Sequence, residues 1–378
     1  MAVRGVDGTA LRLLACESEV ISGVLAPPAH ECARSSQLCR VVRQQSTQKG
    51  TVAAHRRRIA PLSRATIRFV SVPPTPDPRA TGIRFIGVDL AWGEGSPTKR
   101  PRETGLAAID ATGTVLDAGW ARGIDDVAAW VLSMASPGSI VAIDAPLVVE
   151  NPTGMRLAER QVGMGYGRWK VAANASNQAL GWQGGVTLRR LLEASGLRYT
   201  DGLTPADPTA RSMFECYPYT TIVGMEELGY TVERPRYKRM VKGLPTAEAR
   251  AVRAAACDEL ITRMRTLDAA DPPLRLASHP LTRTLLDEPS PISDVPYKHR
   301  EDLLDALLCA WTASIWHRHG LDRAQVLGNT DARDADGRRP TIVAPARPEQ
   351  RVEGRAMRPL KRHELIMSGP ALPRNAPV

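Results

Sequence analysis

The sequence has no long hydrophobic run. Nowhere in its 378 residues does a stretch approach the roughly 18–20 apolar residues that a membrane-spanning helix needs. Near the N-terminus, "ALRLLAC" is short and is followed by Glu17 and Glu19, which interrupt the apolar core that a signal peptide needs. We therefore expect no membrane partner and a cytoplasmic location.

Cysteine motifs for metal binding are also missing. The six cysteines include no CxxC pair, and their spacing fits no zinc module. Three of them, Cys216, Cys257 and Cys309, are scattered through residues 81–345, which is too sparse for a disulfide framework. We expect reduced thiols, which agrees with a cytoplasmic setting.

The central part of the chain has no excess of positive charge, although the whole chain has a net charge of +10. Residues 1–80 carry 12 Lys and Arg against 5 Asp and Glu, and residues 346–378 carry 7 against 3. Residues 81–345 carry 31 against 32. The basic character therefore belongs to the two ends and does not indicate a basic groove for a long duplex.

Domain organisation follows from the same contrast. Residues 1–80 show no sustained periodicity and end in "VPPTPDPRATG", so we interpret them as a disordered segment with a Pro-rich linker, or as sequence upstream of the true start. Residues 346–378 form a polar C-terminal tail by the same criteria. Residues 81–345 contain no internal repeat and form one predicted domain.

The first half of this domain predicts a mixed sheet. "IRFIGVDLAW" has the short, branched and apolar pattern of a buried strand. "GLAAID" and "VLDAGWA" are two strands joined by the hairpin sequence "ATGT", and residues 124–134 form a helix. "GSIVAIDAPL" is a further strand, which we expect to lie parallel to the first one, beside a meander of the first three.

The second half adds a fifth strand and three helical regions. Residues 148–210 contain two helical stretches and form a predicted insertion over one edge of the sheet. "RSMFECYPYTTI" is the fifth strand. A long helix begins at "TAEARAV" with Thr246 as its N-cap, and the last helix begins at "REDLLDALL" and ends at Gly320. The predicted class is α/β, with a mixed five-stranded sheet flanked by helices.

Five acids lie at the ends or inside these apolar elements. Asp89 and Asp144 end two strands that we expect to be parallel, so both emerge at the edge where open α/β sheets bind ligands. Glu215 lies inside the fifth strand, and Asp302 and Asp305 share one face of the last helix. These five are the predicted catalytic carboxylates.

Buried carboxylates need partners, and a divalent cation is a partner that several of them can share. Oxygen ligands favour Mg²⁺ or Mn²⁺, and a pair of such ions about 3.5–4 Å apart can support phosphodiester hydrolysis. Three of the acids also have a simpler interpretation. Asp144 could begin a turn, Asp302 could be a first-turn acid that the helix dipole favours, and Glu215 could pair with an arginine.

Two basic residues are candidates for substrate binding. Arg156 shares a short helical face with Glu159 and Arg160, which predicts either a phosphate contact or a solvated charged face. Lys238 lies in "RPRYKRMVKG", which could follow a phosphate backbone or could face solvent.

The stretches "FIGVDLAW", "AIDAPL", "ECYP" and "EDLLDALLCAWTA" resemble the family called domain of unknown function 429, over about residues 84–320. The resemblance implies a ribonuclease-H-like fold and a nuclease activity. The last helix is also similar to that of Holliday-junction resolvases, where an Asp–x–x–Asp–Ala pair completes a metal site. By this resemblance the metal-binding carboxylates are Asp89, either Asp144 or Glu215, and Asp302 with Asp305. We favour Asp144 as the inner ligand, because its strand should neighbour the first strand, and the metal set is then Asp89, Asp144 and Asp305.

The predicted function is that of a metal-dependent nuclease, with Mg²⁺ or Mn²⁺ as cofactor and a nucleic acid or another phosphodiester as partner. The alternatives are a non-catalytic acidic binding module of the same fold and an actin-like or sugar-kinase-like phosphotransferase. The last is disfavoured, because "LAWGEGSPT" places bulky Leu90 and Trp92 where a phosphate turn needs small residues. The sequence leaves the substrate class and the oligomeric state open.

Overall fold

The computed structural model describes residues 82–91, 100–181, 183–352 and 355–356. The predicted N-terminal segment, 1–80, and most of the predicted C-terminal tail lie outside the described residues. None of the helices within the described ranges combines the length and hydropathy that a bilayer crossing requires.

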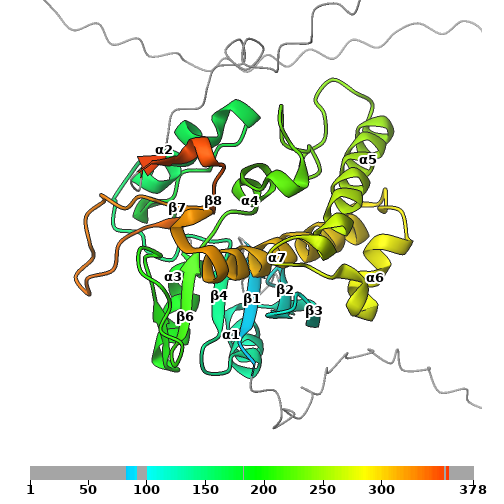
Figure 1. Ribbon diagram of the computed structural model, residues 1–378. Helices are drawn as coiled ribbons and strands as arrows, with labels where there is room; N and C mark the ends of the chain where they lie inside the picture. The colour runs from blue at the N-terminus through cyan, green and yellow to red at the C-terminus, as the bar shows by residue number, and fades with distance from the viewer. Residues whose placement is uncertain (1–81, 92–99, 182, 353–354, 357–378) are drawn as a thin grey trace, which may run out of the picture. The chain divides into compact units, whose positions relative to one another are not determined.

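A six-stranded mixed sheet forms the centre of the domain (Figure 1). Strand β2 is antiparallel to both of its neighbours, β1 and β3, whereas β4, β6 and β5 continue parallel to β1. In spatial order the strands are β3 (Val115–Arg122), β2 (Glu103–Asp110), β1 (Arg84–Asp89), β4 (Ile140–Ile143), β6 (Arg211–Glu215) and β5 (Leu197–Tyr199). The predicted meander and the parallel pairing of β1 with β4 are confirmed. The sixth strand, β5, has only three residues, too few to show a period-2 pattern.

Helices cover both faces of the sheet, and the strands bury side chains on both. Ile86 and Val88 of β1 pack in a cluster with residues of α1 (Ile124–Met134) and α3 (Gly184–Ala194). Phe85 belongs to the cluster on the opposite face, where α7 (Asp294–His319) crosses β1, β2 and β4 (Figure 1). Because successive residues of a strand point to opposite faces, this pattern assigns each strand residue to one layer.

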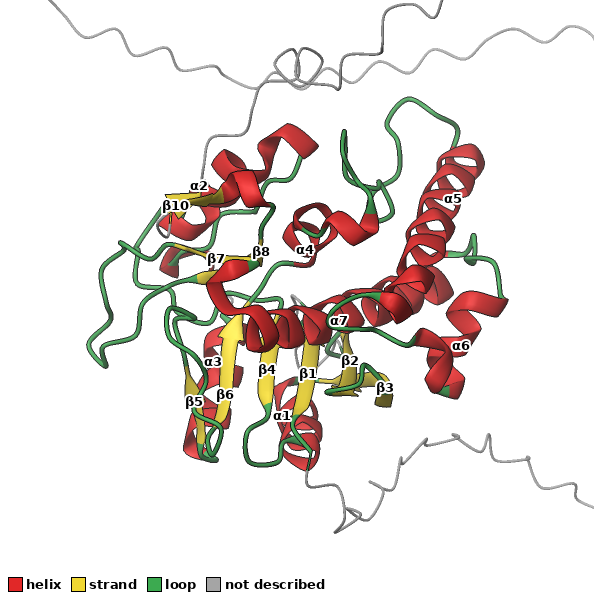
Figure 2. Cartoon of the chain, in the orientation of Figure 1, coloured by secondary structure: helices red, strands yellow, loops and turns green. Residues whose placement is uncertain are grey.

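Smaller elements surround the two ends of α7 (Figure 2). In Figure 2, α5 and α6 lie toward one end of α7, and α2 with β7, β8 and β10 lies toward the other. These elements are α2 (Leu157–Tyr166), α4 (Pro218–Gly224), α5 (Thr246–Arg265), α6 (Pro280–Asp287), β7 (Ala324–Leu327), β8 (Ile342–Pro345), β9 (Arg351–Val352) and β10 (Arg355–Ala356).

Three sequence predictions differ from the structure at element boundaries. The fifth predicted strand ends at Glu215, because Pro218 begins helix α4. The N-cap of α5 is Pro245, one residue before the predicted Thr246. Helix α3 packs beside α1 on a face of the sheet, so this part of the predicted insertion is a regular covering layer and does not lie over an edge.

The domain also continues beyond the predicted boundary at residue 345. The Arg347 side chain is buried and donates hydrogen bonds to the carbonyl oxygens of Val223 and Tyr230. Gln350 is likewise buried and donates to the carbonyl oxygen of Gly165. These contacts join residues far apart in the sequence, so the local composition of the segment, which is polar, did not indicate them.

Two glycines allow α7 to lie directly on the sheet. A Cβ atom at Gly87 of β1 would overlap the backbone of Ala306, and one at Gly105 of β2 would overlap the carbonyl oxygen of Asp302. Helix and strand backbones are therefore in contact at these two points. A strand residue with a side chain larger than that of glycine would prevent the contact. This close approach sets the height of α7 above the ends of β1 and β2.

We predict that Gly87→Ala and Gly105→Ala each lower the free energy of unfolding by about 1–3 kcal/mol, because the added methyl group must displace α7. Gly119 of β3 is the control, since a Cβ atom there meets nothing within 4 Å. Urea denaturation of the three variants measures the effect. A loss in Gly119→Ala equal to that in the other two would contradict the assigned contact.

Candidate functional site

A cavity of about 970 Å³ opens at the carboxyl ends of the central parallel strands. Its lining is unusually rich in charge. The acidic residues of the lining are Asp89, Asp144, Glu159, Glu215, Asp294, Glu301 and Asp302, with Glu103 at β2, and the basic ones are Arg102, Arg122, Arg156, Lys238, Arg239, Lys298 and His299. Four of the five predicted catalytic carboxylates therefore line one cavity.

The strand register brings Asp89 and Asp144 together. Val88 pairs with Ile143, and the Asp144 N–H donates to the Val88 carbonyl oxygen at 2.8 Å, so the two acids occupy equivalent places at the ends of neighbouring strands. Phe85 and Ala142 belong to the cluster on the α7 face. By strand alternation both acids point toward α7.

Glu215 points to the other face of the sheet. Met213, two residues earlier in β6, packs in the cluster beneath α1 and α3. Glu215 shares that orientation by alternation, and its carboxylate accepts hydrogen bonds from Arg156 at 2.5 and 2.8 Å and from the Leu147 N–H at 2.9 Å. The sequence left Asp144 and Glu215 as alternatives. Of these two acids, Asp144 is the one that lies beside Asp89. Both Glu215 oxygens accept hydrogen bonds, which confirms the alternative that Glu215 pairs with an arginine.

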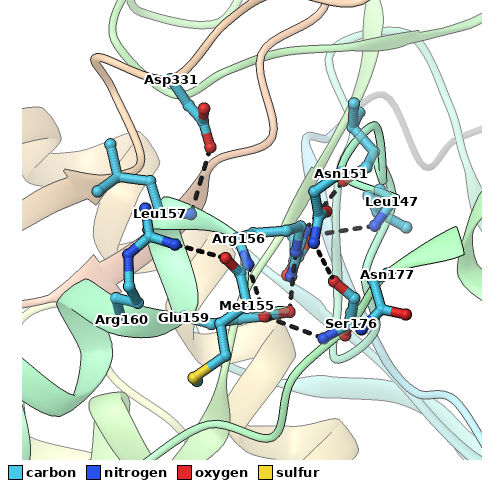
Figure 3. Close-up of polar contacts among 12 residues, drawn as sticks. Leu147, Asn151, Met155, Arg156, Leu157, Glu159, Arg160, Ser176, Asn177 and Asp331 are labelled. Carbon is cyan, nitrogen blue, oxygen red and sulfur yellow. Dashed lines mark hydrogen bonds and ion pairs between the residues drawn. The ribbon is translucent and has the colours of Figure 1, made fainter. Parts of the chain in front are cut away.

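Arg156 is buried and is held by polar contacts, several of which Figure 3 shows. It is the N-cap of α2, and its guanidinium also donates to Glu159 at 2.8 Å and to the Val148 carbonyl oxygen at 3.1 Å. Glu159 in turn accepts from the Arg156 N–H and the Ser176 N–H, both at 3.0 Å. The prediction of a solvated face is wrong, since only Arg160 of the three is exposed, and the phosphate contact at Arg156 stays a prediction.

Helix α7 brings its two aspartates over the strand ends. Asp302 and Asp305 are buried one turn apart, and Asp302 lies where the helix backbone meets Gly105. The Lys298 ammonium is 2.6 Å from Asp302 Oδ1 and 2.9 Å from Glu301 Oε1. Asp302 thus has a cationic partner on its own helix.

Asp305 has partners from the loop after α4. The Tyr237 hydroxyl donates to Asp305 Oδ1 at 2.5 Å, and the Lys238 ammonium lies 2.6 Å from Oδ2. The ammonium–Oδ2 pair is close, but its angles fall outside those of a hydrogen bond. Lys238 also lies 4.0 Å from Asp144 Oδ2, so it joins acids of two different elements. We call Asp89, Asp144, Asp302 and Asp305 the acidic cluster.

One protein-family model matches more than half of the chain. The model of a family described as "Protein of unknown function (DUF429)" matches residues 87–332. The chain belongs to this family. The matched range contains the whole acidic cluster together with Lys238 and Lys298. No curated protein and no solved structure matches the chain.

Three carboxyl groups of the acidic cluster in this DUF429 member have raised pKa values. Burial and the neighbouring Asp89 raise the pKa of Asp302 to about 9. Burial raises the pKa of Asp305 to about 7, with Lys238 opposing the rise and Asp89 adding to it. Burial likewise holds the pKa of Asp144 well above its usual range against the effect of Lys238. The two lysines therefore do not neutralise the cluster.

The cluster supplies oxygen donors of the kind that Mg²⁺ and Mn²⁺ prefer. Across the ranges that the structure describes, no three His, Cys, Asp or Glu side chains are already grouped as metal ligands. The cations that contact the acids are Lys238 and Lys298. A divalent ion would therefore meet these ammonium groups as competitors.

Sequence reasoning missed Lys298, Glu301 and Tyr237. Lys298 stands four residues before Asp302 on one helix, and this spacing alone indicates an ion pair. Tyr237 and Asp305 are 68 residues apart in sequence, and no local pattern relates them. The predicted substrate residue Lys238 does line the cavity, although its ammonium contacts the acids.

The raised pKa values predict how stability depends on pH without metal. Carboxyl groups whose pKa is higher in the folded state bind protons more tightly when folded, so their contribution to stability is lost as pH rises through the folded pKa. In EDTA, the wild-type Tm should therefore fall between about pH 6 and 9 more steeply than that of Asp302→Asn. Asp125→Asn, an exposed change in α1, should follow the wild type. Parallel curves for wild type and Asp302→Asn would contradict the prediction.

The buried ion pair gives a second prediction. Arg156→Met should lower the free energy of unfolding by about 3–5 kcal/mol, because it leaves Glu215 charged and without its partner. Arg160→Met on the same helix should change it little. In Arg156→Met, Glu215→Gln, part of the loss should be recovered, as chemical denaturation would show. Full stability of Arg156→Met would refute the structural role and leave the substrate-binding one.

Proposed function

We propose that this DUF429 chain is a metal-dependent nuclease of ribonuclease-H-like fold that hydrolyses phosphodiester bonds with Mg²⁺ or Mn²⁺. The observation that carries the proposal is the acidic cluster, in which two strand ends and one helix bring four carboxylates together, three of them lining one cavity. The order of the sheet supports the fold assignment, since an antiparallel meander followed by parallel strands is what the family resemblance implies.

The donor set fits a hard divalent cation. Asp89 has no ion-pair partner among the described residues, and it adjoins Asp144 through the strand register. Asp302 lies close enough to Asp89 for each charge to be felt by the other. Asp89, Asp144 and Asp302 would hold the ion, with Asp305 beside them. When bound, it would activate water and stabilise the leaving oxygen of the phosphodiester.

The residues around the cluster would bind and orient the substrate. Arg102, Arg122 and Arg239 line the same cavity and would attract a phosphodiester by charge. The Tyr219 ring forms part of the wall, with Lys238 at 5.1 Å and Arg234 at 4.2 Å from its centroid. This wall would shield the reacting phosphate from water and strengthen the electrostatic contacts within the cavity.

One observation favours a second candidate, a non-catalytic acidic binding module. Lys238 and Lys298 already contact Asp305 and Asp302, as counter-ions do in purely structural sites. The raised pKa values favour a functional site, because strongly shifted carboxyl groups gather at such sites. The two candidates differ in turnover, which a cleavage assay measures.

We predict that Asp89→Asn, which changes a metal ligand, reduces cleavage by about 100-fold or more, and that Asp305→Asn, which changes a supporting group, reduces it by about 10–100-fold. The assay compares single-stranded, duplex, hybrid and branched substrates in Mg²⁺ and in Mn²⁺. Asp125→Asn should retain full activity, and circular dichroism should show all three variants folded.

Thermal stability in Mn²⁺ separates the outcomes, because a ligand that binds the folded state raises Tm. Stabilisation of the wild type without cleavage of any substrate would favour the binding module. Equal cleavage by wild type and both cluster variants would refute the nuclease assignment.

A further inference from the structure

The two lysines at the acidic cluster differ in what they join. Lys238 bridges acids from two separate elements, with its ammonium 2.6 Å from Asp305 of α7 and 4.0 Å from Asp144 after β4. Lys298 contacts Asp302 and Glu301, which lie within one turn on its own helix. Only Lys238 makes the cross-element bridge that a metal ion makes between ligands.

They also differ in freedom. The Lys238 side chain is 19% exposed and lies above the rings of Tyr219 and Tyr237, at 5.1 and 5.9 Å from their centroids. The Lys298 side chain is 56% exposed. Its partners Asp302 and Glu301 are buried, at 4% and 8% exposed, so Lys298 can move into solvent only if another cation takes its place beside them. Lys238 cannot leave without uncovering the fully buried carboxylate of Asp305 and losing the attraction of two aromatic faces.

We infer that Lys238 is a built-in cation that takes the place of a second metal ion, so that the site binds a single divalent cation. That ion would lie at Asp89, Asp144 and Asp302, where Lys298 gives way to it, while Lys238 stays between Asp144 and Asp305. This inference rests on the metal dependence in the proposed function. It replaces the pair of ions expected for such chemistry by one ion and one ammonium group.

Calorimetric titration of the folded domain with Mn²⁺ tests the inference through stoichiometry, without reference to activity. The wild type should bind one Mn²⁺. Lys238→Gln removes the charge but keeps a donor for Asp305, and it should bind two. Lys238→Arg keeps the charge and should bind one.

Two further variants serve as controls. Lys298→Met should still bind one Mn²⁺, about tenfold more tightly, because a competing cation has been removed. Lys242→Met, at an exposed position near Lys238 in sequence, should match the wild type.

The outcomes separate this inference from the proposed function. Two ions in the wild type, or one ion in folded Lys238→Gln, would overturn the built-in cation and leave the metal-dependent nuclease intact. No Mn²⁺ binding by the wild type would overturn both. If Lys238→Gln does not fold, the wild-type stoichiometry and that of Lys238→Arg still decide, since two ions in either contradicts the inference.

Discussion

The contact between helix α7 and the backbones of β1 and β2 is the constraint on which the site depends. Gly87 and Gly105 remove the side chains that would otherwise separate helix from sheet. Helix α7 therefore lies low enough for Asp302 and Asp305 to meet Asp89. A helix held further away would leave each acid to find its own partner or water. The backbone contact between α7 and the sheet therefore determines how close the acids of the cluster lie to one another.

Strand alternation then divides the carboxylates at this sheet edge into two groups with different surroundings. Glu215 points away from α7 and is matched by Arg156, whose planar guanidinium satisfies both of its oxygens. Asp89 and Asp144 point toward α7, where the only cationic contacts among the described residues are two lysines. Burial without full compensation raises the pKa of the acids there. Glu215 therefore has a matched partner, whereas the acids beneath α7 have raised pKa values, and our proposal assigns the cation to the latter group.

Much of this arrangement could be read from the sequence. The apolar runs before Asp89 and Asp144 predicted two parallel neighbouring strands, and the spacing of Asp302 and Asp305 predicted their shared face. The orientation of Glu215 could not be read, because Met213 and Phe214 are both buried and conceal the alternation. The pairing of Arg156 with Glu215 joins residues 59 apart, and only the folded chain brings them together. The same holds for the contacts of Asp305 with Tyr237 and Lys238, in which Lys238 is a counter-ion, whereas its predicted substrate contact stays a prediction.

Anomalous scattering from a crystal grown in Mn²⁺ tests the central claim most directly, because it locates the ion without assuming any activity. The account predicts a manganese peak bonded to oxygens of Asp89 and its neighbours in the acidic cluster, with the Lys298 ammonium displaced from Asp302. A crystal in which manganese binds only outside the acidic cluster, with both lysines still in contact with their acids, would contradict the account.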